Sequence, residues 1–265
     1  MRKLEILSRD NPKIKLYCKL RDKRSARDKE GLFVLEGARI IADAVKEKIP
    51  LKAAFYTSDA AAKYSDTVAA ICDILGDNAY LISEEVSAKL GNTTSPQGIF
   101  AVSERLDKTP PLDKIVSGKF LVLDDLQDPG NIGTILRAAD AVGISGVYLC
   151  GGCDIYNPKL VRSTMGSLFR VPVCDRLSYA EVISLFKNSS VKTYAAVVDK
   201  DADSLQEFSF PGSCAVVIGN EGNGISQADA DLCDGKITIK MCGNIESLNA
   251  ASAATIFLWE LMKGE

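Results

Sequence analysis

The 265-residue sequence contains no histidine, one tryptophan and no uninterrupted run of 18 apolar residues. Without histidine, the Ser-His and Cys-His pairs that activate nucleophiles are excluded, as are zinc sites with histidine ligands. Any proton removed in catalysis must go to a carboxylate, lysine, tyrosine, cysteine, an atypical arginine or water. The missing apolar run predicts no membrane span, and the start Met-Arg-Lys-Leu-Glu is not typical of a secretory signal. We therefore expect a cytoplasmic protein with no membrane partner.

The eight cysteines are also informative because most of them lie inside apolar runs such as 213–218. That placement is typical of buried free thiols in a reducing compartment. Cys150 and Cys153 form the one Cys-x-x-Cys pair. A redox or metal interpretation of this pair needs a helix N-terminus behind it or a second matching pair, and the sequence shows neither. We expect no metal site.

Charge is unevenly distributed along the chain. Residues 1–30 carry eleven Lys or Arg and five Asp or Glu, a local charge of +6, whereas the whole chain has a formal charge of −3. A basic segment can bind RNA phosphates with an affinity that falls as salt rises. Taken alone, the basic segment is slightly better explained as a solvated helix face with partners such as Asp28 and Glu30. A nucleic-acid site elsewhere in the chain raises the odds of RNA binding. The candidate RNA contacts are Lys13, Lys15, Lys19, Arg21, Lys23, Arg24 and Arg27.

The order of the apolar runs predicts two α/β domains. Strands of the first are expected at 32–36, 51–56, 78–82 and 98–102, and its helices from Gly37, at 60–75 and at 83–90. Strands of the second are expected at 119–124, 146–150, 191–198, 214–218 and 236–241. They alternate with helices, which is typical of a mostly parallel sheet with helices on both faces. Because Pro110-Pro111 ends regular structure, we expect a small α/β domain at 1–105, a linker at 106–117 and a larger α/β domain at 118–265.

Three segments with Gly- or Asn-rich turns follow predicted strands of the second domain: 123–137, 218–225 and 239–249. Because open α/β sheets bind ligands at the carboxyl ends of their strands, we expect these turns to line one active-site crevice. The glycines of the second segment permit close approach of a ligand. This segment lacks the Lys-Ser/Thr ending of a phosphate-binding loop and the position of a dinucleotide fingerprint. A turn that binds the adenosine of a cofactor and a plain tight turn remain equal alternatives.

Single residues of these segments also allow simple structural explanations. The side chain of Arg137 lies off the apolar stripe of a helix expected to start near Asn131, where a guanidinium can hold a phosphate or an alkoxide. By itself, an ion pair of Arg137 with Asp140 or Asp124 is the favoured explanation. Ser247 is expected to cap a helix at 248–261, and capping alone would explain both Ser247 and Asn249.

Together, the three segments resemble the signature of the SpoU group, also called TrmH-like, of the SPOUT RNA methyltransferases. The resemblance covers about 120–265 and includes 156–173, whereas residues 1–105 are similar only in layout to the small substrate-binding domain of that family, although 33–39 fits. It implies a trefoil knot in the C-terminal domain and S-adenosylmethionine as cofactor. It also implies an RNA substrate, rRNA or tRNA, and a homodimer that completes the site across two subunits.

The resemblance also assigns roles to residues of this sequence. The matching catalytic residues are Asn131, Arg137, Glu221, Ser247 and Asn249. The matching cofactor-binding residues are Gly219, Gly222, Ile239, Met241 and Leu248. One departure is Lys240, where the family usually has proline. The implied reaction is methyl transfer from the sulfonium of S-adenosylmethionine to a ribose 2′-hydroxyl, with Arg137 as general base in the family's mechanism. Because arginine stays charged in most sites, stabilisation of the alkoxide by Arg137 is an equal alternative, with phosphate or water taking the proton.

The resulting hypothesis is an S-adenosylmethionine-dependent RNA ribose 2′-O-methyltransferase that acts on rRNA or tRNA. One alternative is a non-catalytic RNA-binding or ribosome-assembly protein of the same fold. Such a binder has no need of all five matching catalytic residues, so their presence argues against it. The other alternative is an RNA base methyltransferase, which would keep the cofactor and the knot but change the acceptor atom.

Overall fold

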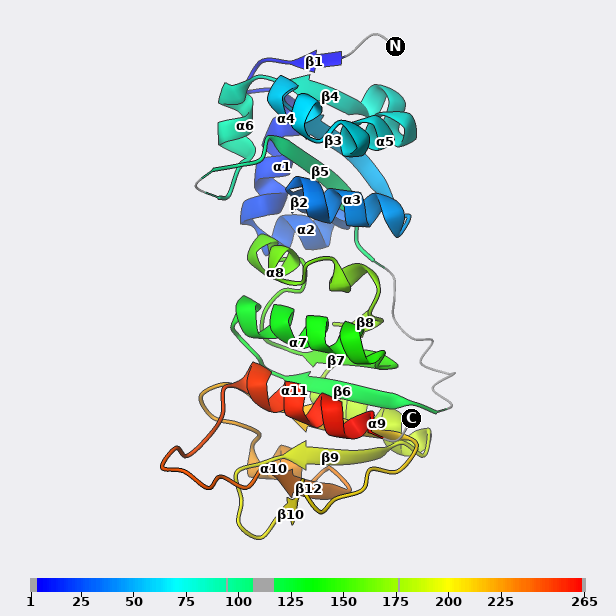
Figure 1. The fold of residues 1–265 in the computed structure, drawn as a ribbon, viewed down its shortest axis with the longest axis vertical. Helices are drawn as coiled ribbons and strands as arrows, with labels where there is room; N and C mark the ends of the chain where they lie inside the picture. Colours follow the sequence, from blue (N-terminus) through cyan, green and yellow to red (C-terminus); the bar gives the residue numbers. More distant parts are fainter. Residues whose placement is uncertain (1–3, 94, 107–116, 176, 264–265) are drawn as a thin grey trace. The chain divides into compact units, whose positions relative to one another are not determined.

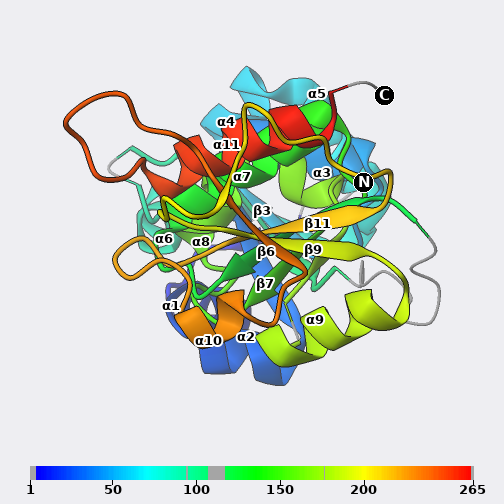
Figure 2. The same cartoon turned by 90° about the horizontal axis from the view of Figure 1, so that it is seen from below.

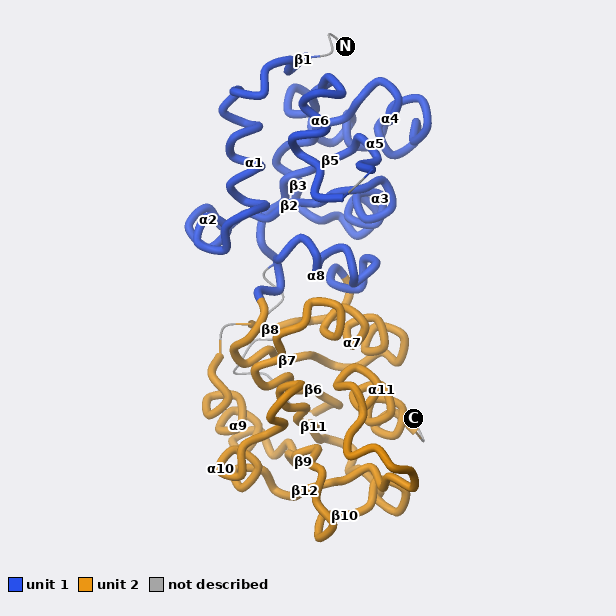
Figure 3. The backbone as a smooth tube through the Cα atoms, turned by 90° about the vertical axis from the view of Figure 1, so that its left-hand side faces the viewer, with its two compact units in different colours: residues 1–107, 154–169 blue, residues 108–153, 170–265 orange. Residues whose placement is uncertain are grey.

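The computed structural model describes residues 4–93, 95–106, 117–175 and 177–263. The chain forms two compact units (Figure 3). Unit 1 contains residues 1–107 and 154–169, and unit 2 contains residues 108–153 and 170–265. The segment 154–169 therefore folds with the N-terminal unit, although it lies well inside the C-terminal half of the sequence.

Unit 1 is built on a mixed sheet with the strand order β1-β4-β3-β5-β2 (Figure 1). Its strands are β1 (Leu4–Ile6), β2 (Leu32–Glu36), β3 (Leu51–Tyr56), β4 (Ala79–Ile82) and β5 (Ile99–Glu104). Within residues 4–93 its helices are α1 (Pro12–Asp22), α2 (Arg24–Glu30), α3 (Ala38–Lys46), α4 (Ser58–Lys63), α5 (Ser65–Leu75), the short η1 (Gly76–Asn78) and α6 (Glu84–Leu90). The linker expected at 106–117 lies almost entirely outside the described residues. Strand β5 runs antiparallel to both β2 and β3, whereas β4 pairs parallel with β1 and β3.

Helix α1 shows why the basic N-terminal segment folds onto this sheet. Asn11 caps the helix by accepting a hydrogen bond from the amide of Lys13, and Pro12 occupies the first turn, where its missing N–H costs nothing. Ile14, Tyr17 and Leu20 follow at helical spacing and are buried in a core that includes aromatic rings from β3 and β5. The lysines of α1 are thereby turned outward.

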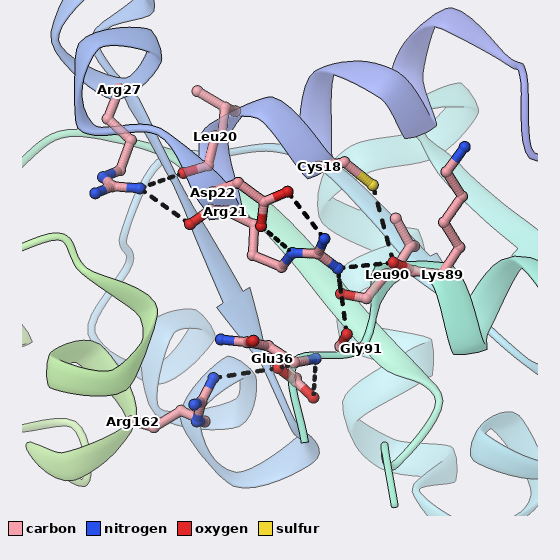
Figure 4. A network of polar contacts seen from close by, with 11 residues as sticks. Cys18, Leu20, Arg21, Asp22, Arg27, Glu36, Lys89, Leu90, Gly91 and Arg162 are labelled. Atoms are coloured by element: carbon pink, nitrogen blue, oxygen red, sulfur yellow. Dashed lines mark hydrogen bonds and ion pairs between the residues drawn. The ribbon is translucent and has the colours of Figure 1, made fainter. Parts of the chain in front are cut away.

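The segment 154–169 contributes α8 (Pro158–Ser163) and the short η2 (Ser167–Phe169) to unit 1. Two ion pairs join it to the N-terminal residues. Arg27, which is 4% exposed, binds Asp154 at 2.5 Å. Arg162 donates to the buried carboxylate of Glu36 at 3.2 Å, as Figure 4 shows. Buried charges are tolerated when they are paired in this way.

Unit 2 contains a seven-stranded, all-parallel sheet with the order β10-β12-β9-β11-β6-β7-β8. The strands are β6 (Lys119–Asp124), β7 (Gly146–Cys150), β8 (Val173–Cys174), β9 (Lys192–Ala196), β10 (Asp203–Ser204), β11 (Cys214–Ile218) and β12 (Gly235–Thr238). The central strands β6, β7 and β11 are apolar along most of their length, as expected for a sheet that is covered on both faces.

Helices cover both faces of this sheet. They are α7 (Pro129–Val142), α9 (Tyr179–Asn188), α10 (Gln227–Ala230) and α11 (Ala250–Leu261). Helices α7 and α11 lie on one side, and α9 and α10 lie on the other (Figure 2). Helix α9 begins with a capping box formed by Ser178 and Glu181 and buries Val182, Ile183 and Phe186 against the sheet.

The fold class expected from the sequence is confirmed: a small α/β unit precedes a parallel sheet with helices on both faces. Several boundaries differ from the expected ones. The helix expected at 60–75 is two helices that meet at Tyr64. The strand expected at 236–241 ends at Thr238. The last helix begins at Ala250 rather than 248, and its cap is Asn249, not Ser247, because the Asn249 side chain accepts from the amides of Ala251 and Ser252.

Candidate cofactor and active site

The site lies at the carboxyl edge of the parallel sheet of unit 2. Strands β6 and β11 are direct neighbours in register, with Leu123 opposite Ile218, so the first and second Gly- or Asn-rich turns leave the sheet side by side. The third turn follows β12, which is separated from β11 by β9. Crevices at this edge are where open α/β sheets bind ligands.

A pocket of about 500 Å³ opens between the second and third turns. Its lining includes no residue of the first segment, 123–137, so two of the three expected turns form its wall. Its lining includes all five residues that the sequence assigned to the cofactor: Gly219, Gly222, Ile239, Met241 and Leu248. The lining also contains residues that sequence reasoning missed: 196–199, Asn220, Gln227, Lys236, Glu246 and Phe257. Residues 196–199 are contributed by the end of β9, because β9 lies between the strands that carry the second and third turns. Residues 196–198 were predicted to lie inside a strand at 191–198, whereas β9 ends at Ala196, so these residues were not recognised as part of a ligand pocket.

The pocket combines apolar walls with polar groups, which suits a ligand with an aromatic base and a charged amino-acid end. Ile239, Met241 and Leu248 supply aliphatic surface, while the turn at 219–224 brings backbone close to the cavity. Glycine is required at 219, because a Cβ there would lie 2.3 Å from the backbone carbon of Gly224. These features fit an adenosyl cofactor such as S-adenosylmethionine.

The side chain of Asn220 links the second turn to the first by hydrogen bonds. Its Nδ2 donates to the carbonyl of Asp125 at 2.9 Å, and its Oδ1 accepts from the amides of Gly222 and Asn223. Asp125 itself has a positive φ of 54°, a conformation that non-glycine residues adopt rarely. Asn220 therefore holds a sharp turn in each of two loops.

Three of the predicted catalytic residues form a continuous polar chain. Asn249 Nδ2 donates to Asn131 Oδ1 at 3.0 Å, and Asn131 Nδ2 donates to Glu221 Oε1 at 3.0 Å. Glu221 also accepts from the amides of Gln127 and Asp128. The chain thereby connects the N-terminal ends of α7 and α11 with the loop after β11.

The charge of Glu221 is stabilised by these contacts. Partial burial of the carboxyl raises its pKa, but the hydrogen bonds from Asn131, Gln127 and Asp128 outweigh that effect and leave the pKa below its ordinary value of 4.5. Glu221 is therefore an ionised acceptor at neutral pH, suited to orienting Asn131.

The two other predicted catalytic residues have different surroundings. Ser247 is exposed and lines the pocket. Arg137 is exposed on α7, about two turns beyond Asn131. Within the described part of the chain, Arg137 makes no hydrogen bond or ion pair, and Asp140 pairs with Arg170 instead. The Arg137 ion pair that the sequence favoured is thus not formed, and Arg137 is not among the residues that line the pocket.

The predicted RNA contacts of unit 1 divide into two groups. Arg21 and Arg27 act within the fold: Arg21 donates to the carbonyls of 89–91 (Figure 4), and Arg27 is buried against Asp154. The other candidates are exposed on or beside α1 and α2: Lys13, Lys15, Lys19, Lys23 and Arg24.

Two further observations concern metals and membranes. Cys150 is buried at the end of β7, and within residues 4–93, 95–106, 117–175 and 177–263 no cluster of three Cys, Asp or Glu side chains could hold a metal ion. Across those same residues, every helix is too short or too polar to cross a membrane.

A parallel α/β unit with a cofactor-sized pocket at its carboxyl edge places the chain among nucleotide-cofactor enzymes, and comparison with known proteins specifies the family. Residues 118–259 match the SpoU rRNA Methylase family, and residues 11–101 match the MRM3-like substrate binding domain. The chain belongs to the SpoU rRNA methylase family.

Relatives support this assignment over the full length. The chain is 33% identical, over 97% of its length and 98% of the relative's, to the 23S rRNA (guanosine(2553)-2′-O)-methyltransferase RlmP of Bacillus subtilis. It is 31% identical, over 96% of its length and 90% of the relative's, to the 23S rRNA (uridine(2479)-2′-O)-methyltransferase of Streptomyces viridochromogenes. An AdoMet-bound rRNA methyltransferase from Sinorhizobium meliloti superposes with a TM-score of 0.84 at 28% identity, over 97% and 96% of the two chains.

The sequence-based recognition is confirmed, as are the enzyme class and the cofactor. The chain is an S-adenosylmethionine-dependent methyltransferase of RNA, of the rRNA or tRNA 2′-O-ribose type.

Proposed function

We propose that this enzyme methylates a ribose 2′-hydroxyl of large-subunit rRNA, with S-adenosylmethionine held in the pocket at the carboxyl edge of unit 2. The observation that carries the proposal is the convergence of the five predicted cofactor residues on one pocket, beside the polar chain from Glu221 to Asn249. Two relatives that match almost the whole chain are named as 23S rRNA 2′-O-methyltransferases, which supports large-subunit rRNA over tRNA.

S-adenosylmethionine, when bound, supplies an electrophilic methyl group on its sulfonium. The residues of the chain then have to position the ribose and stabilise its developing alkoxide. We assign stabilisation of the alkoxide to Arg137, whose guanidinium is not engaged by the rest of the described chain, and we assign the proton that leaves the 2′-hydroxyl to water or an RNA phosphate. Glu221, Asn131 and Asn249 hold the ends of α7 and α11 in place, and Ser247 contributes a hydroxyl at the pocket wall.

The position of Arg137 supports a homodimer. Arg137 does not line the pocket of its own chain. On the adjoining helix α11, Trp259 is 67% exposed and Ile256 is 39% exposed, and apolar side chains of this kind are typical of an interface. We assign these residues to a contact with a second copy of the chain, which would bring Arg137 to the partner's pocket.

The exposed basic residues of unit 1 complete the proposal. We assign Lys13, Lys15, Lys19 and Arg24 to phosphate contacts with the RNA, and we no longer assign that role to Arg21 and Arg27 because both serve the fold. Residues 1–105 then select the RNA, residues 118–265 perform the transfer, and the enzyme works in the cytoplasm. The trefoil knot in residues 118–265 is part of the same proposal.

Transfer of a labelled methyl group to unmodified rRNA and, separately, to unmodified tRNA tests the substrate. We expect label in 23S rRNA, at a nucleotide that resists alkaline cleavage because its 2′-hydroxyl is blocked. Label in tRNA alone would contradict the substrate assignment, and label at an alkali-sensitive nucleotide would show base methylation. Binding of S-adenosylmethionine without transfer to either pool would point to a ribosome-assembly intermediate as substrate, and no binding of cofactor would favour a non-catalytic RNA-binding protein.

The role of Arg137 gives a direct test by mutation. Arg137→Ala should lower the rate of methyl transfer by about 100-fold to 1,000-fold, as loss of a donor to a developing oxyanion does, while calorimetry shows little change in S-adenosylmethionine affinity. Thr134→Ala, one turn earlier on the exposed side of α7, is the matched control. Unchanged turnover in Arg137→Ala would remove this residue from the mechanism.

A further inference from the structure

A second cavity, distinct from the cofactor pocket, lies within unit 1. Its volume is about 310 Å³, and its lining includes Arg39, Ile40, Gln97, Arg162 and Met165 around the carboxylate of Glu36. This volume is at the lower end of the range for small-ligand pockets, about 300 to 1,000 Å³. It can accept one nucleoside-sized group but not a duplex. The proposed mechanism uses none of these residues.

The polar groups of this cavity are mainly hydrogen-bond donors. Arg39 is exposed on the first turn of α3, and among the described residues its guanidinium has no ion pair or hydrogen bond. Gln97 uses Oε1 to accept from the amide of Ala38 at 2.8 Å, which leaves its Nε2 donors directed elsewhere. Ligands with many acceptor oxygens, such as a phosphate or the carbonyls of a base, match such a set.

The carboxylate of Glu36 does not make the cavity unfavourable for a ligand with acceptor oxygens. This carboxylate is buried and accepts from the amide of Asn92, from the hydroxyl of Thr93 and from Nη1 of Arg162 at 3.2 Å (Figure 4). The carboxylate is therefore already occupied by donors. Its effect is to hold the guanidinium of Arg162 at the cavity wall, since a buried carboxylate fixes its partner strongly.

The cavity also offers surfaces on which a base can pack. Ile40 and Met165 are apolar, and Arg39 and Arg162 belong to the same lining. RNA-binding proteins read single-stranded nucleotides by splaying a base out and stacking it on aromatic rings or arginine planes. Residues 36–97 lie inside the part that matches a substrate binding domain, whereas Arg162 and Met165 come from the part that matches the methylase family. The two parts of the sequence complete one cavity.

We propose that this cavity binds one unpaired nucleotide of the RNA substrate, with Arg39 on its phosphate and the base packed against Ile40, Met165 and Arg162. The inference rests on the proposed function, because it takes RNA as the partner. It adds a recognition site in unit 1 that is separate from the methyl-transfer site and from the lysines of α1.

Arg39→Gln is the test variant, and Lys46→Gln is the matched control. Lys46 is exposed in the last turn of α3, outside the cavity, so its substitution removes the same charge from the same helix. The probe is a 23S rRNA transcript, with filter binding at several salt concentrations. We expect Arg39→Gln to weaken binding about 10-fold and to reduce the slope of log affinity against log salt by about 1, while Lys46→Gln changes neither.

Photo-crosslinking provides a second readout that does not depend on a substitution. A transcript containing 4-thiouridine and 6-thioguanosine should crosslink to peptides that contain Ile40 or Met165. Equal affinities and slopes for wild type and Arg39→Gln, or equal losses for both variants, would overturn the inference, as would crosslinks confined to α1 and unit 2.

The outcomes also separate this inference from the proposed function. If the wild type binds the transcript but methylates no RNA, the proposed function fails and the binding comparison still decides the cavity. If methylation occurs and Arg39→Gln behaves as wild type, only the cavity assignment fails. If the wild type binds no RNA, both fail.

Discussion

At the scale of single residues, Glu221 shows how a side chain acquires a defined charge from its neighbours. A carboxyl whose pKa is lowered in the folded protein stabilises the fold above its ordinary pKa, and that stabilisation is lost as pH falls through the lowered value. For Glu221 the contribution is complete above about pH 4.5 and disappears below it. It is small, because the side chain is exposed to solvent.

Hydrogen exchange of the Gln127 and Asp128 amides measures this effect locally, since both donate to Glu221. At neutral pH these amides should exchange more slowly in the wild type than in Glu221→Gln, and the ratio should approach one below pH 4.5. Glu246→Gln is the control, because Glu246 lines the same pocket without contacting either amide. A ratio that does not change with pH would contradict the assigned ionisation.

At the scale of secondary-structure elements, Asn249 has two functions that a substitution can separate. Its Oδ1 caps α11, and its Nδ2 links α11 to Asn131 on α7. Asn249→Asp keeps a capping oxygen but loses the donor, so we expect wild-type thermal stability and a transfer rate lowered about 10-fold or more. Asn249→Ala should lose both functions and also destabilise the protein by about 0.5 to 2 kcal/mol.

Ser252→Ala, which truncates a polar side chain in the same turn of α11, controls for the general effect of a substitution there. A normal rate in Asn249→Asp would show that the link between α7 and α11 has no role in catalysis.

The same elements show what the sequence could and could not predict. Strands β6 and β11 were predicted to the residue, because fully buried parallel strands are uninterrupted apolar runs bounded by turn residues. The predicted end of β12 at residue 241 was wrong. Ile239 and Met241 look like strand residues because they are apolar, but their side chains line the pocket instead of continuing the sheet. Both Ser247 and Asn249 are good capping residues, so local propensity could not choose between them, and the bond to Asn131 is a tertiary contact.

Ion pairs between residues far apart in the sequence could not be predicted from local sequence patterns either. Arg27 was read as an RNA contact because it belongs to a basic segment, but its partner Asp154 is 127 positions away. In contrast, the five cofactor residues were assigned by resemblance, and the structure places all of them on one pocket. Their individual roles stay predictions until variants are measured.

At the scale of the whole molecule, the buried pair of Arg27 and Asp154 should be important for stability. Asp154→Ala should lower the free energy of unfolding of unit 1 by about 3 to 5 kcal/mol, because it leaves a buried guanidinium without its carboxylate. Urea unfolding measures the change. The double variant Arg27→Met with Asp154→Leu should recover most of the loss, and failure to recover would show that the charge itself is not the cause.

The proposed homodimer is the second prediction at this scale. Trp259 is the single tryptophan, so its fluorescence reports on the environment of α11 alone. We expect a blue shift of its emission as protein concentration rises, a dimer by sedimentation velocity, and an inactive monomer for Trp259→Glu. Lys263→Glu, just beyond α11, introduces a carboxylate at a position whose side chain is exposed and pairs with Glu260, and it is the control. A fully active wild-type monomer would contradict the dimer.

The return of residues 154–169 to unit 1 restricts how such enzymes can exchange their parts. A recombination event at the linker would join a foreign N-terminal half to a segment that still carries Asp154 and Arg162, the partners of Arg27 and Glu36. A chimera keeps both ion pairs only where its N-terminal half supplies partners that match Asp154 and Arg162, so exchange of unit 1 as a whole should involve two separated stretches of the gene.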